Sequence, residues 1–267
     1  MGGIDIEHLT RDFGSGRGVF DITFSVAPGE VFGFLGPNGA GKTTTIRHLL
    51  GFLRARAGSV AIDGKNPWAN ASVLDDVGYV PGELALLDMK AGAYLHFLER
   101  YRSRTAERKD ELVALFELPL DLPIRKMSKG MKQKVGIVAA FMFSPRILIL
   151  DEPTSGLDPL MQNRFVDLVE EEKRRGCAIL LSSHIFDEVQ RTADRIGIIR
   201  AGHMVAVDTA AALRERHMRH YTVTLASPEE AAAFSRDFGG SSEGCTATVS
   251  ASQNLERIFL DYYKEQR

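Results

Sequence analysis

The chain has 267 residues, of which 44% are hydrophobic and 25% charged, a composition typical of a globular protein with one large domain and a small appendage. Its formal net charge of −2 argues against electrostatic binding of nucleic acid, so we expect no nucleic-acid partner. Its two cysteines, Cys177 and Cys245, form neither a disulfide framework nor a metal-ligand spacing, which predicts a reducing, cytosolic setting. The N-terminus shows no signal-peptide pattern, and no apolar run is long enough to span a membrane.

Alternating and continuous apolar patterns predict the first strands. Residues 4–9 and 20–26 read as strands, and the clean alternation of apolar and polar residues through 20–26 is typical of an antiparallel pair. Residues 31–35 form a short apolar run that ends in a glycine-rich turn, and the helix that follows is expected to end at Gly51. A further strand is expected at residues 59–62.

The glycine-rich turn has the pattern of a phosphate-binding loop. It reads Gly36-Pro37-Asn38-Gly39-Ala40-Gly41-Lys42-Thr43-Thr44, which fits the motif G-x-x-x-x-G-K-[ST] between a strand and a helix. Glycines let the backbone turn tightly, so that successive N–H groups and the start of the helix point at one anion. We expect Lys42 to reach the β- and γ-phosphates of a nucleotide, and the Thr43 hydroxyl to bind Mg²⁺. An ordinary glycine-rich turn is the weaker interpretation, because the flanking strand and helix are both visible.

From about residue 84 to residue 145 the spacing of apolar residues becomes helical. This block predicts a helical subdomain inserted into an α/β domain. Its basic residues are predicted to form a solvent-exposed face, with partner binding as the weaker alternative. These basic residues are Arg100, Arg102, Arg104, Arg108 and Lys109.

Polar residues follow two apolar runs that read as strands of a parallel sheet. The run 147–150 ends in Asp151 and Glu152, and the run 178–183 ends in His184. Ligands bind at the carboxyl ends of such strands, so these side chains are expected beside the phosphate loop if the strands are neighbours. Asp151 suits a Mg²⁺ ligand, and Glu152 suits a group that polarises the attacking water. His184 alone is weak evidence, because a lone histidine at a strand end is usually structural.

The C-terminal part of the chain predicts a small appendage over residues 211–267. Strands are expected at 221–225 and 246–250, a helix at 229–238, and a Gly/Ser loop between that helix and the second strand. A final helix would carry one apolar stripe, formed by Leu255, Ile258, Phe259 and Tyr262.

The predicted fold class is therefore α/β. We expect a phosphate-loop NTPase core within residues 1–210, with a mostly parallel central sheet, an antiparallel β subdomain and the helical subdomain at about 84–145. The appendage at 211–267 is expected to be a small α+β unit.

One further stretch indicates a family. Ser128-Lys129-Gly130-Met131 precedes an apolar helix, and Ser128 is placed to cap it, which leaves the helix N-terminus exposed to an anion. With this stretch, residues 4–207 closely resemble the ATP-binding cassette (ABC) family, the nucleotide-binding subunits of ABC transporters. Gly36–Thr43 resembles the Walker A motif, Ile147–Asp151 the Walker B motif, Ser128–Met131 the signature motif and Ser155–Asp158 the D-loop. The fold and the ATPase activity of that family are what the resemblance implies.

The resemblance also implies the roles of individual residues. Glu152, His184 and Lys42 would be catalytic, with His184 as the switch histidine, and Thr43 and Asp151 would bind the Mg²⁺ that accompanies ATP. Phe13 falls where the family stacks an aromatic ring on adenine. The full set implied to bind the nucleotide is Phe13, Gly36, Pro37, Asn38, Gly39, Ala40, Gly41, Lys42, Thr43, Thr44, Ser128, Lys129, Gly130, Met131 and Asp158.

The family mechanism, as an implication, needs two cassettes. They would pair head to tail as a homodimer, with ATP between the phosphate loop of one copy and the signature helix of the other. Ser128 and Gly130 would contact the γ-phosphate of the partner's ATP, His184 would contact that of its own, and Asp158 would link the two sites. Closure on ATP and reopening after hydrolysis would move a membrane partner.

Two departures from the family pattern stand out. Gly82 stands where the family usually has a glutamine, so no side chain at this position can contact Mg²⁺ or water; Glu83 or a water molecule would have to substitute. Lys129 and Met131 stand where the usual signature has Gly and Gln. Lys129 either adds positive charge near the phosphate or faces solvent.

The signature and the tail resemble cassettes that serve ABC-2-type exporters. We therefore expect an ATPase subunit on the cytoplasmic face of the cell membrane, docked on a separate permease chain through the block 94–104 and the loop at Gly82. The alternative is a soluble ABC-type ATPase that acts on nucleic acid or ribosomes. A third class, a regulator that binds ATP without turnover, is suggested by Gly82.

Overall fold

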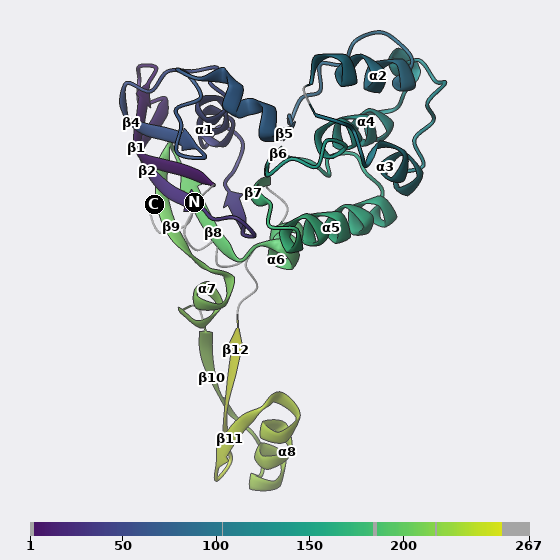
Figure 1. The fold of residues 1–267 in the computed structure, drawn as a ribbon. Coiled ribbons are helices and arrows are strands. Elements are labelled where there is room, and N and C mark those ends of the chain that lie inside the picture. The colour runs from purple at the N-terminus through teal and green to yellow at the C-terminus, as the bar shows by residue number, and fades with distance from the viewer. Residues whose placement is uncertain (1–2, 103, 184–185, 217, 253–267) are drawn as a thin grey trace. The chain divides into compact units, whose positions relative to one another are not determined.

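Two units make up the chain in the computed structural model, which describes residues 3–252 except 103, 184, 185 and 217 (Figure 1). The larger unit spans residues 1–207 and the smaller one residues 208–267. The predicted final helix, with Leu255, Ile258, Phe259 and Tyr262, lies outside the described residues, as does His184.

A six-stranded sheet forms the centre of the larger unit, in the order β5-β6-β7-β3-β8-β9. The first five of these strands run parallel to their neighbours. Every residue of β3, β6 and β7 is buried, which explains why their sequences are nearly continuous apolar runs. The strands are β3 (Val31–Leu35), β5 (Val77–Val80), β6 (Ile147–Asp151), β7 (Ala178–Ser183), β8 (Arg195–Arg200) and β9 (His203–Thr209).

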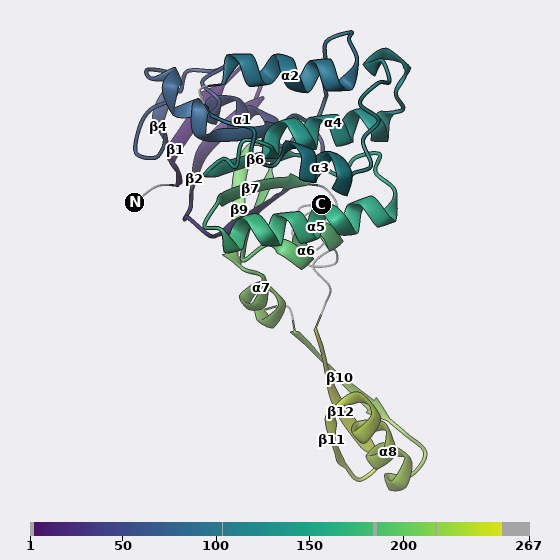
Figure 2. The same ribbon diagram turned by 45° about the vertical axis from the view of Figure 1, so that its right-hand side comes forward.

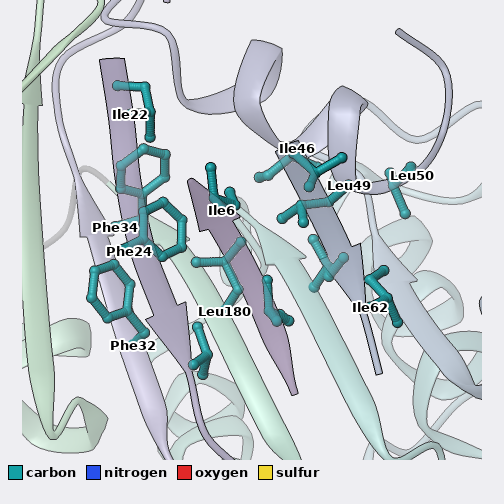
Figure 3. Packing of buried hydrophobic residues seen from close by; sticks show 14 of the residues in the cluster. Ile6, Ile22, Phe24, Phe32, Phe34, Ile46, Leu49, Leu50, Ile62 and Leu180 are labelled. Carbon is teal, nitrogen blue, oxygen red and sulfur yellow. The ribbon is translucent and has the colours of Figure 1, made fainter. Parts of the chain in front are cut away.

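A second, antiparallel sheet has the order β2-β1-β4 and packs through its apolar face on the first helix and the central sheet. Figure 3 shows side chains of both sheets and of that helix meeting in one cluster. The rings of Phe24 and Phe32 stack there with centroids 4.6 Å apart, and Ile46 and Leu180 are completely buried. The elements are β1 (Ile4–Asp12), β2 (Gly18–Val26), β4 (Ala57–Ile62) and α1 (Lys42–Leu49).

The predicted helical insertion is present. Its helix α4 contacts both α2 and α3, and the three lie together in Figures 1 and 2. Ser128 caps α4, as its sequence position predicted, and Asp158 caps α5, because each side chain accepts a hydrogen bond from the backbone N–H three residues on. The elements are α2 (Ala91–Tyr101), α3 (Lys109–Leu115), α4 (Lys129–Phe141), α5 (Pro159–Arg174), α6 (Phe186–Thr192) and the 3₁₀ turns η1 (Ala71–Asp76) and η2 (Ile124–Lys126).

The prediction of a solvent-exposed basic face in this insertion is wrong for most of its members. Arg102 donates hydrogen bonds to the carbonyl oxygens of Leu74, Asp75 and Val77, at 2.8–3.2 Å. Arg104 pairs with Asp76. The chain leaves α2 beside η1 and β5, so these cations fasten the insertion to the core.

Arg108 departs furthest from that prediction. It is only 4% exposed and pairs with Glu111, Glu171 and the equally buried Glu172 of α5. These interactions raise the pKa of Arg108, and burial raises that of Glu172. Charge spacing along the sequence does not reveal such a pair, because its two partners are 64 residues apart.

In the described part of the smaller unit, an antiparallel sheet has the order β10-β12-β11, and the helix α8 packs against β11 and β12. Ser227 caps α8, and Gly239, in the left-handed region, ends it. The predicted Gly/Ser loop is wrong in part, since Gly240–Glu243 forms β11 by backbone pairing with β12. The elements are α7 (Ala210–Arg216), β10 (Met218–Thr224), α8 (Pro228–Phe238), β11 (Gly240–Glu243) and β12 (Thr246–Ser252).

Candidate functional site

The carboxyl ends of three adjacent parallel strands, β6, β7 and β3, bring the candidate site together. Strand β3 leads into the phosphate loop and α1, β6 ends at Asp151, and β7 carries Ser182 beside Asp151. The predicted adjacency of the phosphate loop and the carboxylates therefore follows from the strand order.

The phosphate loop curls around the ammonium group of Lys42. Gly39 and Gly41 have φ angles of 81° and 116°, in the region where only glycine is unstrained, and α1 begins directly after them. Lys42 is 6% exposed, and its Nζ donates a hydrogen bond to the Gly36 carbonyl oxygen at 2.6 Å. The same Nζ lies 3.6 Å from Glu152 Oε1. A buried cation and a helix N-terminus thus converge where a phosphate group would bind.

Asp151 is held by hydroxyl groups on both of its oxygens. Thr43 Oγ1 donates to Oδ2 at 2.9 Å, and Ser182 Oγ donates to Oδ1 at 2.8 Å. Asp151 is only 2% exposed. A carboxylate and a threonine hydroxyl side by side are hard oxygen ligands of the kind that Mg²⁺ takes beside nucleotide phosphates, so these residues fit that ion.

Glu152 occupies a tight turn directly after β6. Its φ angle is 52°, a left-handed conformation that costs energy for a residue with a side chain and that concentrates at functional sites. Its backbone N–H donates to the Ser182 carbonyl oxygen at 2.8 Å, and its carbonyl oxygen accepts from the Ser155 N–H at 3.2 Å. These two bonds fix the direction in which the Glu152 carboxylate leaves the backbone, and the carboxylate lines the pocket described next.

A pocket of about 870 Å³ opens beside the phosphate loop. Tyr79 lies in its wall, where burial above all, and then the negative charge of Asp151, raises the pKa of the phenol to about 12, so the hydroxyl stays protonated at neutral pH. Its lining residues are Pro37, Asn38, Gly39, Gly41, Lys42, Thr43, Thr44, Arg47, Phe52, Tyr79, Pro81, Gly82, Glu83, Ala85, Asp151, Glu152 and Ser155.

Comparison with known proteins decides the family. Residues 19–155 match the family described as "ABC transporter", over half of the chain. The chain belongs to the ABC transporter ATP-binding family. The predicted family, the α/β fold class and the ATPase assignment are thereby confirmed.

Named relatives of this ABC subunit share most of its length. The bacitracin transport ATP-binding protein BcrA of Bacillus licheniformis is 34% identical over 230 residues, which are 84% of this chain and 75% of the relative. The linearmycin resistance ATP-binding protein LnrL of Bacillus subtilis (strain 168) is 36% identical over 223 residues, 80% and 71% of the two chains. A solved structure, an ATP-binding subunit of an ABC transporter, is 30% identical with a TM-score of 0.74 over 80% of this chain and 92% of that one. These similarities favour a transport subunit over an ATPase that acts on ribosomes.

No helix among the described residues of the subunit is long and apolar enough to cross a membrane.

The signature residues of the subunit do not line its own nucleotide pocket. Ser128 accepts a hydrogen bond from the Met131 N–H at 3.2 Å, and Gly130 packs against the backbone of Gly156. None of the residues 128–131 lines the pocket. Lys129 is exposed and does not line the pocket, and its Nζ donates to Ser155 Oγ at 2.7 Å.

Three further positions singled out in the sequence can be located relative to the pocket. Asp158 accepts from the Met161 N–H at 3.0 Å and lies outside the pocket lining. Phe13 is 53% exposed, does not line the pocket, and lies under the guanidinium of Arg11, 5.3 Å from the ring centroid. A Cβ added to Gly82 would lie 3.5 Å from Asp151 Oδ2, so a side chain at this position would stand beside the candidate metal ligands.

Sequence reasoning did not predict the roles of Ser182, Tyr79 and Ser155. Ser182 carried a usable signal, because a serine pair at the carboxyl end of an apolar parallel strand lies where ligands bind. Tyr79 carried none, because its place in the pocket wall depends on how β5 packs. Ser155 was identified only as the start of the stretch that resembles the D-loop, and not as a residue of the pocket wall.

Proposed function

We propose that this subunit binds and hydrolyses ATP with Mg²⁺ between two copies of itself, and so drives transport through a separate membrane permease. The observation that carries the proposal is that none of the residues 128–131 lines the pocket of its own chain, whereas seven residues of the phosphate loop, 37–39 and 41–44, do. A capped helix N-terminus left free in this way suits the phosphates of a nucleotide held by a second copy.

The residues of the pocket have different roles in binding and hydrolysis. Lys42 and backbone N–H groups of residues 38–44 hold the phosphates, with the buried ammonium already positioned by the Gly36 carbonyl oxygen. Thr43 and Asp151 would hold Mg²⁺, which supplies charge neutralisation at the β- and γ-phosphates when bound. The Glu152 carboxylate accepts a proton from the attacking water.

Several roles rest on the family resemblance. His184 would contact the γ-phosphate, Phe13 would stack on adenine, and Ser128, Gly130 and Asp158 would act across the pair of cassettes. The cassette domain would comprise residues 1–210 and the appendage residues 211–267. The resemblance also assigns nucleotide contacts to further residues of the phosphate loop and the signature stretch. These residues are Pro37, Asn38, Gly39, Ala40, Gly41, Thr44 and Met131.

Export is the proposed direction of transport. The relatives include a bacitracin transport protein, a linearmycin resistance protein and Nod factor export proteins. The subunit would sit on the cytoplasmic face of the cell membrane through its permease, with no nucleic-acid partner. The transported molecule never enters the ATP pocket, so it would be recognised by the permease.

The substitution Glu152→Gln tests the paired arrangement. It removes the proton acceptor and keeps the size of the side chain, so ATP and Mg²⁺ should trap a dimer that light scattering after size exclusion detects as a doubled mass. Glu107→Gln, at an exposed position away from the pocket, is the matched control and should elute as the wild type does. An E152Q protein that stays monomeric in saturating ATP, alone and with its permease, would contradict the proposal.

A further inference from the structure

The first two turns of the signature helix α4 contact the loop that carries Glu152. The Nζ of Lys129 donates to Ser155 Oγ at 2.7 Å, and Gln133 Nε2 donates to the Pro153 carbonyl oxygen at 2.7 Å. Lys129 and Gln133 are four residues apart and therefore lie on the same face of α4. Two contacts thus hold one short loop at two points, and we call them the α4 clamp.

Backbone packing fits the clamp. Gly156 has a φ angle of 84°, and a Cβ added to it would lie 3.2 Å from Lys129 Cγ. A Cβ at Gly130 would overlap the Gly156 carbonyl oxygen. The two glycines therefore let α4 approach the loop closely enough for the Lys129 stem to lie across it and its ammonium to reach Ser155.

The clamped loop is continuous with the reacting end of the pocket. Ser155 lines the pocket, and its N–H donates to the Glu152 carbonyl oxygen at 3.2 Å. The Leu157 N–H donates to the Thr154 carbonyl oxygen at 3.0 Å, and Gln133 is 2% exposed at its end of the clamp. A displacement of Ser155 would thus also displace Glu152, because a single backbone turn joins the two residues.

We propose that Lys129 is a positioning residue that, with Gln133, holds Glu152 in its productive orientation within the same chain. The inference rests on the proposed function, and it gives a role to the lysine that replaces the usual signature glycine. Without the ammonium, Ser155 loses a charge-assisted hydrogen bond, and the loop populates more conformations. Glu152 is then correctly placed for a smaller fraction of the time, whereas the phosphate loop that binds ATP is untouched.

Steady-state kinetics of the full-length subunit, with its permease, separate this role from nucleotide binding. For Lys129→Met we expect kcat to fall about three- to ten-fold, because one exposed charge-assisted hydrogen bond is lost. The KM for ATP should change less than about two-fold. Lys129→Arg should retain most of the wild-type kcat. Lys132→Met, on the same helix and outside the clamp, is the matched control and should behave as the wild type does.

A double-mutant comparison tests the named contact itself. Ser155→Ala should lower kcat to a similar extent, and adding it to K129M should cost little more, because the two substitutions remove the same bond. Fully additive losses would overturn the proposal. So would a K129M protein with unchanged kcat, or one with raised KM and unchanged kcat, which is the result expected if Lys129 binds the partner's nucleotide.

Hydrogen–deuterium exchange gives a readout that needs no turnover. In the nucleotide-free protein, the peptide covering 152–157 should exchange faster in K129M than in wild type, while the α1 peptide 42–49 stays unchanged. Equal exchange of 152–157 in the two proteins would overturn the clamp even if the ATPase activity is normal. If the wild type lacks ATPase activity but the peptide 152–157 still exchanges faster in K129M, the clamp stands and only the proposed function is contradicted.

Discussion

The Thr43 hydroxyl lies 2.9 Å from Asp151 Oδ2, although 108 residues separate the two in sequence. Their meeting follows from the parallel strands β3, β7 and β6, which end at one edge of the sheet. Ser182 on the middle strand β7 holds the other oxygen of Asp151, so the carboxylate cannot rotate away without losing both bonds. The sheet thus preorganises the end of the pocket at which Mg²⁺ would bind.

The first prediction concerns Asp151. Asp151→Asn keeps the shape of the side chain and removes the charge that would bind Mg²⁺, so hydrolysis should fall by about 100-fold or more, as expected when a preorganised electrostatic group is lost. Titration of activity with Mg²⁺ checks this, because higher concentrations should restore little of the rate. Asp167→Asn, on the exposed side of α5, is the control. An unchanged Mg²⁺ dependence in D151N would remove Asp151 from the metal site.

The second prediction concerns Gly82. Its φ angle is not in the left-handed region, and an added Cβ would make an ordinary contact 3.5 Å from Asp151 Oδ2, so Gly82→Gln should fold with a wild-type Tm. The new amide would stand beside the Mg²⁺ ligands, and the Mg²⁺ concentration for half-maximal activity should fall about five-fold, the effect of one added hydrogen bond.

Gly82→Ala is the matched control for that variant, because it adds the Cβ alone. It should leave the Mg²⁺ dependence as in the wild type. Identical behaviour of the Gln and Ala variants would show that position 82 does not reach the metal site.

The third prediction concerns the buried pair of Arg108 and Glu172. Arg108→Met leaves Glu172, which is 1% exposed, without its main counter-charge, since Arg175 lies 3.9 Å away and is itself 45% exposed. The free energy of unfolding should fall by about 3–5 kcal/mol near neutral pH. Arg100→Met, at an exposed position of α2, should change it by less than about 0.5 kcal/mol.

The pH dependence of that variant has a definite sign. Burial raises the pKa of Glu172, and removal of Arg108 raises it further, so the folded variant binds a proton that the unfolded chain releases near its usual pKa of about 4.3. Stability is therefore regained as the pH falls through the folded pKa and lost as the pH rises through it. Urea denaturation at pH 5.5 and pH 8.0 should show a smaller deficit at pH 5.5. A constant deficit, or one that grows at low pH, would contradict this account.

The apolar patterns of the sequence predicted the strands that carry the site. The runs at 31–35, 147–150 and 178–183 predicted parallel strands because strands buried on both faces need apolar side chains throughout. Their order in the sheet was not predicted, but any adjacent order would bring Thr43 and Asp151 to one edge.

The parts that the sequence did not predict depend on partners far along the chain. The sequence suggests a surface position for Arg108, but in the structure α5 places Glu172 against it. The sequence also shows no partner for Lys129, whereas in the structure Ser155, in the loop after β6, accepts a hydrogen bond from it at 2.7 Å. Strand β11 has no alternating pattern, and only its backbone pairing with β12 makes it a strand. The spacing of apolar residues along the sequence indicates which side chains are buried, but it does not indicate which charged side chains pair with one another.

The central claim is that this subunit hydrolyses ATP at the phosphate loop, and Lys42→Ala tests it most directly. Lys42 is buried and bonded to the Gly36 carbonyl oxygen, whereas Lys65, the control, is exposed. Release of phosphate from ATP should be dependent on Mg²⁺ in the wild type and in K65A, and should be lost in K42A. Equal phosphate release by K42A and the wild type would contradict the account.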